Sequence, residues 1–388
     1  MNKKIINYGS HHISNLDIKN TIASLQSNYI TQGANVEGFE KKLSSYFGSK
    51  YAKVLSNGTA ALHLAIKSLN LKQSSLVLTT PITFISTASA ILMNNLYPDF
   101  ADINLKSYTL DINKVEDKLK KNKKIKAIIG VDYAGHPCDW KSLSYLKKKY
   151  GVYLINDNCH ALGSGYLGKK NYASKYADVV TQSFHAVKNF TTGEGGAVLT
   201  NDPKINNFIK EYRSHGMIKE PVSKNYRMWF YKVAKFGYNY RLSDFQCALG
   251  ISQLKQLDIF VKKRRLIAEK YNLYLSKYSE YLKIPEVNKK KCYHSYHLYP
   301  LLINFKKLKI KKNIFFLKML KKGYRLQVHY IPLYKQPFLK KFCNFYNKEM
   351  FLNSEKFYYQ EVSLPIFYNY KKLQQSRFIK SMLDTLGL

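Results

Sequence analysis

Cysteine is scarce in this chain, and the few cysteines form no recognisable pattern. They are five in number among 388 residues, scattered and without a CxxC pair: Cys138, Cys159, Cys247, Cys292 and Cys343. This distribution argues against a disulfide framework and against a zinc site. We therefore expect the chain to work in the reducing environment of the cytoplasm.

Long apolar runs are also missing. The run at residues 127–131 is among the longest, and it is far short of the roughly 20 residues that a membrane-spanning helix needs. The first residues are basic but no apolar stretch follows them, so we expect neither a membrane span nor a signal peptide.

Acidic residues are few, with 25 Asp and Glu against 63 Lys and Arg, and the net charge is +38. Such a charge is typical of proteins that bind nucleic acid, a membrane surface or a phosphorylated substrate. We favour a compositional bias, because Lys, Asn, Ile and Tyr are abundant together and no nucleic-acid-binding motif accompanies the charge. A polyanion-binding protein remains the alternative outside the enzymes.

The chain does contain a regular alternation of apolar segments and helical patterns between residues 51 and 200. Strands are predicted at residues 51–55, 76–80, 126–131, 153–155, 179–184 and 196–200, and helices at residues 59–69 and 143–150. Strands that alternate with helices predict βαβ units, and hence an α/β fold with a mainly parallel sheet flanked by helices.

The pattern of alternating apolar strands and helices ends at about residue 250, and a different one follows. A long basic helix is predicted at residues 254–278, a shorter one near residues 313–322, and short aromatic-rich segments at residues 301–303 and 326–330. We expect a large domain at residues 1–245 and a smaller C-terminal α+β domain at residues 246–388.

Polar side chains follow several of the predicted strands. Asn57 comes after the first strand, Asp157 after another, and Ser183 and His185 after a third. Ligands of open α/β sheets collect at the carboxyl ends of the strands, so these residues are candidates for a site. Asp157 alone is equally well interpreted as a helix cap.

Lys188 is the candidate with the clearest chemistry. It follows an apolar strand and precedes a glycine-rich turn (residues 193–196) and a further strand. A lysine held there is partly desolvated, which lowers the pKa of its amine and allows it to form a Schiff base. The glycines match no phosphate-binding fingerprint and predict a hairpin turn.

This lysine segment resembles the signature of the DegT/DnrJ/EryC1/StrS sugar aminotransferases, a family of fold-type-I pyridoxal 5′-phosphate (PLP) enzymes. The resemblance extends from Thr31 to Pro365. The segments that carry it, besides residues 183–197, are residues 31–33, 56–62, 81–84, 157–164, 213–217, 237–242 and 328–333.

The resemblance implies a set of cofactor contacts. Lys188 would bind PLP and carry out catalysis, Asp157 would pair with the pyridine nitrogen and Phe84 would stack on the ring, although a phenylalanine there also suits an ordinary core. The remaining implied contacts are Thr59, Ala60 and Ser183 at the phosphate, His160 near the ring hydroxyl where many members have glutamine, and Asn239 from the other subunit of a homodimer with shared active sites.

A narrower resemblance concerns the branch of the family that acts in pseudaminic acid biosynthesis. It implies transfer of an amino group from L-glutamate to C4 of a UDP-linked 4-keto-6-deoxy-2-acetamido hexose. The candidate substrate contacts are Tyr8, Thr31, Gln32, His185, His215, Arg241, His329 and Tyr330.

Other activities stay open within the same fold. The substrate alternatives are dTDP- and GDP-linked keto sugars, and the enzyme alternative is a PLP-dependent dehydratase, in which a histidine replaces the lysine that is present here. His160 and His185 lack a third ligand at metal-site spacing, so we expect no metal.

Overall fold

The computed structural model describes residues 5–219, 229–343, 346 and 348–388. Its large sheet has, among these residues, the strand order β2-β9-β8-β6-β5-β3-β4. The strands span Tyr51–Leu55 (β2), Leu76–Thr79 (β3), Tyr97–Phe100 (β4), Ile125–Val131 (β5), Tyr153–Asp157 (β6), Val179–Ser183 (β8) and Gly196–Thr200 (β9). All neighbouring pairs are parallel except those that β9 makes, which confirms the predicted mainly parallel sheet.

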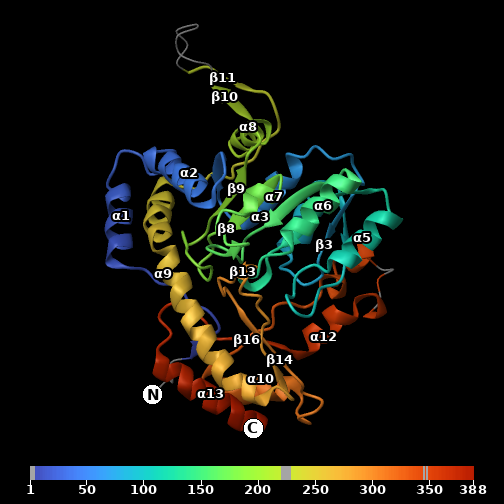
Figure 1. Cartoon of the computed structure of the whole chain (residues 1–388). Helices are drawn as coiled ribbons and strands as arrows, with labels where there is room; N and C mark the ends of the chain where they lie inside the picture. Colours follow the sequence, from blue (N-terminus) through green and yellow to red (C-terminus); the bar gives the residue numbers. More distant parts are fainter. Residues whose placement is uncertain (1–4, 220–228, 344–345, 347) are drawn as a thin grey trace.

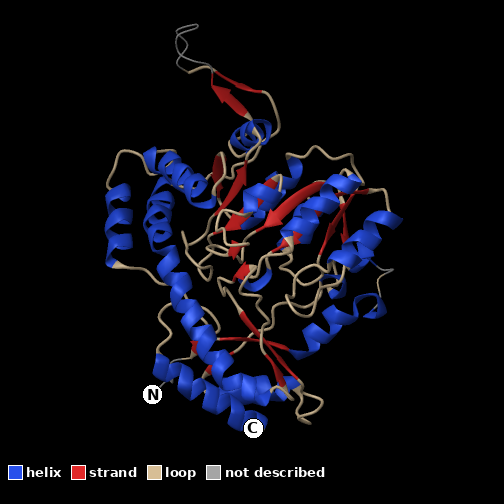
Figure 2. Ribbon diagram, viewed as in Figure 1, coloured by secondary structure: helices blue, strands red, loops and turns tan. Residues whose placement is uncertain are grey.

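Helices cover both faces of this sheet, as Figures 1 and 2 show. One face packs on α3 (Gly58–Lys67), α4 (Ser86–Leu92) and α8 (Pro203–Tyr212). The other packs on α2 (Ala34–Phe47), α5 (Ile112–Lys121), α6 (Trp140–Tyr150) and the first half of α9 (Asp244–Leu275). Side chains alternate between the faces, since Ile128 joins one core and Ile129 the other, as the twofold period of a strand requires.

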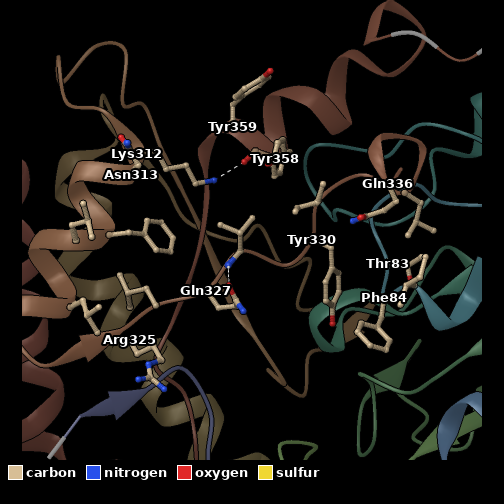
Figure 3. A pocket seen from close by; sticks show the side chains of 18 of the residues that line it. Thr83, Phe84, Lys312, Asn313, Arg325, Gln327, Tyr330, Gln336, Tyr358 and Tyr359 are labelled. Atoms are coloured by element: carbon tan, nitrogen blue, oxygen red, sulfur yellow. Dashed lines mark hydrogen bonds between the residues drawn. The ribbon is translucent and has the colours of Figure 1, made fainter. Parts of the chain in front are cut away.

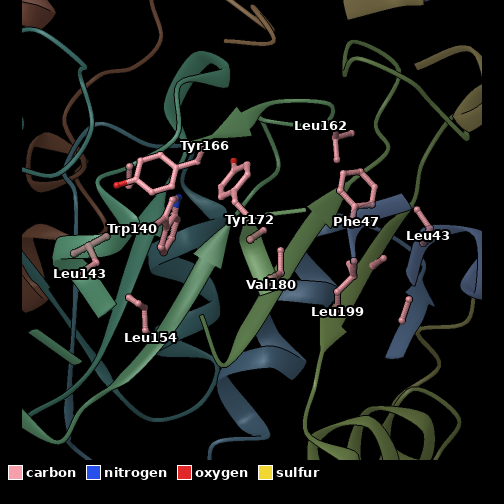
Figure 4. Packing of buried hydrophobic residues seen from close by; sticks show 14 of the residues in the cluster. Leu43, Phe47, Trp140, Leu143, Leu154, Leu162, Tyr166, Tyr172, Val180 and Leu199 are labelled. Carbon is pink, nitrogen blue, oxygen red and sulfur yellow. The ribbon is translucent and has the colours of Figure 1, made fainter. Parts of the chain in front are cut away.

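Figure 4 shows the second of these cores, in which Trp140 of α6 and Phe47 of α2 pack near Leu154 and Val180 of the sheet. The helix termini follow from local sequence. Asp139 caps α6 by accepting from the Ser142 N–H (3.3 Å), and Gly151 ends it with φ 63°, a left-handed conformation that glycine adopts without a steric cost.

A second, smaller core lies around the second half of α9. It contains the antiparallel sheet β12-β14-β16 together with α10 and α13. The strands here are β12 (Leu282–Lys283), β14 (Tyr299–Ile303) and β16 (Glu361–Leu364), and the helices are α10 (Lys312–Lys321) and α13 (Lys372–Leu386). Helix α12 (Leu352–Gln360) contacts β14 but packs in a separate small cluster through Phe357. The helix predicted near residues 313–322 is confirmed, and the long basic helix begins ten residues earlier than predicted.

The remaining elements link these units or project from them. They are β1 (Ile6–Asn7), α1 (Asn15–Leu25), β7 (Gly165–Tyr166), α7 (Ala173–Tyr176), β10 (Met217–Lys219), β11 (Tyr231–Val233), β13 (Cys292–Tyr293), β15 (Tyr324–Arg325) and α11 (Lys340–Cys343). Strand β1 pairs in parallel with β15, so the N-terminal residues join the C-terminal unit. Figure 1 shows β10 and β11 projecting from the body beyond α8.

Helix α9 runs through both cores. Leu257 and Val261 pack in the large core, whereas Ile267 and Tyr271 pack in the small one. The proposed boundary at residue 245/246 thus falls at the start of this helix, while the change from one core to the other occurs inside it.

Asp132, which follows β5, is the polar centre of the large core. The carboxylate is fully buried and accepts from Trp140 Nε1 (2.9 Å), the Cys138 N–H (2.7 Å), Asn158 Nδ2 (3.0 Å) and the Tyr172 hydroxyl (2.6 Å). These bonds tie the loop after β6 to the loop after β5.

We predict that Asp132→Ala lowers the free energy of unfolding by about 3 kcal/mol, because several buried donors lose their acceptor. Chemical denaturation of the variant and of Asp117→Ala measures this. Asp117 is exposed, so its variant should stay within about 0.5 kcal/mol of the parent. Equal stabilities of the two variants would contradict this role for Asp132.

Candidate active site

The candidate site is a cavity of about 770 Å³ at the carboxyl ends of β2, β6 and β8. Because β9 lies between β2 and β8 and runs opposite to both, these strands end at the same edge of the sheet. The cavity gathers most of the residues expected from the sequence: Tyr8, Thr59, Ala60, Phe84, Asp157, His160, Ser183, His185, Lys188, His329 and Tyr330.

Lys188 lies in the connection between β8 and β9, which are antiparallel neighbours as the hairpin prediction required. Its N–H donates to the His185 carbonyl (2.9 Å), and Asn189 Nδ2 beside it donates to the Leu162 carbonyl (2.9 Å). Burial lowers the pKa of the Lys188 amine, while Cys159 and Asp157 act in the opposite direction. The connection therefore holds the Lys188 amine in the cavity, in surroundings that favour its neutral form.

Asp157 is the last residue of β6 and is 4 % exposed. Its carboxylate accepts from Thr87 Oγ1 (3.3 Å) and from the Cys159 N–H (3.2 Å). These two donors fix the carboxylate at the floor of the cavity, within the electrostatic reach of Lys188.

The N-terminus of α3 forms another part of the lining. Asn57 caps this helix by accepting from the Ala60 N–H (2.8 Å), so the Ala60 donor expected for a ligand is already used within the chain. Gly58 lies so close to Ser183 that an added Cβ would come within 2.8 Å of the Ser183 Cβ. The positive end of the helix dipole still faces the cavity.

Histidine and tyrosine side chains form the opposite wall. His160 Nδ1 accepts from the Ala134 N–H (3.3 Å), so its proton lies on Nε2, which contacts the Tyr330 hydroxyl (3.1 Å). Burial, with a smaller contribution from Lys188, lowers the pKa of both His160 and His329, the latter to about 3. Both imidazoles are therefore neutral near pH 7. Phe84 lies nearby; the residue is 54 % exposed, and its ring centroid is 6.0 Å from that of Tyr330.

Five expected residues lie outside this cavity of the same chain: Thr31, Gln32, His215, Asn239 and Arg241. Gln32 and Arg241 line a separate hollow beside Glu40 and Arg213. Thr31 pairs with Ser243, and Asn239 with Ser214, in isolated β-bridges. None of these five side chains lines the cavity that holds Lys188 in the same chain.

The structure also adds residues that our set of candidates omitted. They include Cys159, Tyr240 and His297, which line the cavity beside the candidate Asn57. Cys159 and Tyr240 lie within the family segments quoted above. His297 is buried, and its Nδ1 has no hydrogen-bond partner among the described residues. Nothing in the sequence around it signals a site, because it lies in the segment before β14.

A second hollow of about 990 Å³ adjoins the first, since Thr83, Phe84, Gln327, Val328 and Tyr330 line both. In Figure 3, Phe84 and Tyr330 stand on one side of it and Lys312 and Asn313 on the other. Together the two hollows provide room for an elongated ligand.

The described residues contain neither a membrane-spanning helix nor a cluster of metal ligands. No helix in them is long and apolar enough to cross a membrane. They contain no group of three or more His, Cys, Asp or Glu side chains that is placed to hold a metal ion.

Residues 11–383 match the model of the DegT/DnrJ/EryC1/StrS aminotransferase family. The chain belongs to this family. Its relatives include the UDP-4-amino-4,6-dideoxy-N-acetyl-beta-L-altrosamine transaminases of Campylobacter jejuni strain 81-176, 39 % identical over 98 % of this chain and 97 % of the relative, and of Helicobacter pylori, 35 % identical over 95 % and 94 %.

A solved structure agrees with this family membership. Helicobacter pylori PseC, described as an aminotransferase of pseudoaminic acid biosynthesis, superposes with a TM-score of 0.92 at 32 % identity, covering 99 % of this chain and 100 % of that one. The family fold predicted from the sequence is therefore confirmed over nearly the whole chain.

The lowered pKa of Lys188 has a measurable consequence. We predict that, in protein freed of small ligands, Lys188 is acetylated by a small reagent at lower pH than the exposed Lys120. Asp157→Asn removes a charge that raises this pKa, so it should move the midpoint of Lys188 labelling to still lower pH. Mass spectrometry of the labelled peptides measures both midpoints, and identical midpoints for Lys188 and Lys120 would contradict the assignment.

Proposed function

We propose that this protein is a PLP-dependent aminotransferase that moves an amino group from L-glutamate to C4 of a UDP-linked 4-keto-6-deoxy-2-acetamido hexose. The observation that carries the proposal is that one cavity holds both the Lys188 amine, whose pKa is lowered by burial, and the Asp157 carboxylate, which interacts with it electrostatically. The names of the relatives from Campylobacter and Helicobacter support the sugar substrate.

The side chains of the cavity fit PLP. Lys188 supplies the amine that binds it, Asp157 a carboxylate for the pyridine nitrogen, and Phe84 an exposed aromatic face. The N-terminus of α3, with the Ser183 hydroxyl, supplies a positive dipole and a donor for the phosphate. When bound, the cofactor acts as an electron sink that makes transfer of an amino group possible.

The protein's own part in the reaction is to position the substrates and to move protons. The Lys188 Nζ must be neutral to take up a proton and must then return it, and burial favours the neutral amine. Positioned proton transfer of this kind contributes about 10²–10⁴-fold to the rate. Tyr8, His185, His329 and Tyr330 line the same cavity and are proposed substrate contacts.

We also propose a homodimer with shared active sites. Asn239 and Arg241 lie outside the cavity of their own chain, which suits contacts to the site of a partner. Cys138, Cys159, Cys247 and Cys292 are free thiols, which suits the cytoplasmic location that we propose. The presence of Lys188 argues against the dehydratase alternative.

We predict that the protein with added PLP shows a visible absorption band that L-glutamate abolishes. Lys188→Ala should lack this band and lose turnover by about 10³-fold or more, while Lys120→Ala, which changes an exposed lysine, behaves as the parent. Far-ultraviolet circular dichroism checks that both variants fold. Normal turnover by Lys188→Ala would overturn the proposal.

The shared site has its own test. Lys188→Ala and Asn239→Ala should each be inactive, whereas an equimolar mixture of subunits, after exchange, should recover about a quarter of the parent activity, because half of the dimers then have one complete site. No recovery from a mixture in which exchange is shown by mass spectrometry would contradict the sharing of sites.

A further inference from the structure

Glu361 and Ser363 lie outside the cavity but are bonded to His329, which lines it. They are two residues apart on β16, so their side chains share one face of the strand. Glu361 and Ser363 are fully buried, and His329 is 6 % exposed. A buried carboxylate is costly unless hydrogen bonds satisfy it, which makes its partners informative.

The hydrogen bonds form a chain from the carboxylate to the imidazole. Glu361 Oε1 accepts from the Ser363 hydroxyl (2.6 Å), and the Ser363 oxygen lies 2.8 Å from His329 Nδ1. Glu361 Oε2 accepts from the backbone N–H of His329 (2.9 Å). Both carboxylate oxygens of Glu361 therefore accept a hydrogen bond, one from Ser363 and one from His329.

The chain fixes where the His329 proton lies. A hydroxyl has a single hydrogen, and that of Ser363 is directed to Glu361. Ser363 can then only accept from His329, so Nδ1 carries the proton and Nε2 has a free lone pair. None of the described residues is hydrogen-bonded to Nε2.

We infer that Glu361 and Ser363 hold His329 as a neutral hydrogen-bond acceptor, whose Nε2 receives a hydroxyl or amide N–H of the keto sugar. This inference rests on the proposed function and names two positioning residues for it. The lone pair repels a carboxylate, so the arrangement favours the sugar over the carboxylates of glutamate at this point of the cavity.

The surroundings support a neutral imidazole, and three contacts oppose protonation of the buried carboxylate. His329 faces the Lys188 amine and the Tyr8 ring, whose centroid is 4.7 Å away, and burial together with Lys188 lowers its pKa. Burial raises the pKa of the Glu361 carboxyl to about 7, while the Ser363 hydroxyl, Lys312 of α10 and the His329 N–H act in the opposite direction.

Glu361→Gln tests the arrangement without a change of shape. The amide oxygen must stay at the His329 N–H, which needs an acceptor, so the NH₂ group faces Ser363. The hydroxyl then donates to Nδ1, and the proton of His329 moves to Nε2. Ser363→Ala removes the link, and Ser363→Thr keeps a hydroxyl as the matched control.

The two half-reactions are measured separately, with L-glutamate and with UDP-2-acetamido-2,6-dideoxy-4-keto hexose. We expect Glu361→Gln and Ser363→Ala to raise the KM for the sugar at least about tenfold, with glutamate kinetics within about twofold of the parent and Ser363→Thr close to it. If the folded variants kept the parent's KM for the sugar, or if the rates of both half-reactions fell by the same factor, the inference would be overturned.

A second readout does not depend on the sugar. In protein labelled with ¹⁵N-histidine, the imidazole nitrogen shifts should place the His329 proton on Nδ1 in the parent and on Nε2 in Glu361→Gln. The same tautomer in both would overturn the inference. If the parent aminates no keto sugar but the tautomers differ, the proposed function fails while the positioning of His329 stands.

Discussion

The reversed strand β9 is the constraint on which the site depends. Every other strand of the large sheet points the same way, and β9 lies between β2 and β8, so β2 and β8 end at one edge together with β6. The pairing of Ser183 with Gly196, and of Gly196 with Leu55, fixes this register. It brings Lys188, Asp157 and the N-terminus of α3 around one cavity, although more than 120 residues of sequence separate Lys188 from Thr59.

The same cavity needs the C-terminal unit. Residues 327–330 close it from the side opposite the sheet, and they are held by Ser363, whose N–H donates to the Gln327 carbonyl (2.9 Å), and by Glu361. Helix α9 packs in both cores. The separation between residues 327–330 and the sheet edge at Asp157 therefore depends on how the two cores pack along this one continuous helix. The proposed catalytic residue Lys188 thus lies in the large unit, whereas His329 and Tyr330, two of the proposed substrate contacts, lie in the C-terminal unit.

The sequence predicts the large sheet well because its strands are continuous apolar runs, as strands buried on both faces are. It fails at β4, which contains Pro98 and Asp99, and at β16, where Glu361 and Ser363 are polar. In both strands the buried polar residues form hydrogen bonds with specific partners, and a pattern of apolar residues cannot reveal such partners. In the predicted segment 326–330, only Gln327 makes a β-bridge, because the His329 N–H bonds to a side chain instead of a strand. Within the site, the family segments locate Lys188 and Asp157, whereas His297 reaches the cavity only through tertiary packing.

The most direct test of the central claim follows the nitrogen. The protein would be incubated with ¹⁵N-labelled L-glutamate, PLP and the UDP-linked 4-keto sugar, and the nucleotide sugar product would be examined by mass spectrometry and NMR. Our account predicts one ¹⁵N atom bonded to C4 of the sugar and an equal amount of 2-oxoglutarate. A product that has lost a hydroxyl without gaining nitrogen, or ¹⁵N found only in glutamate, would contradict it.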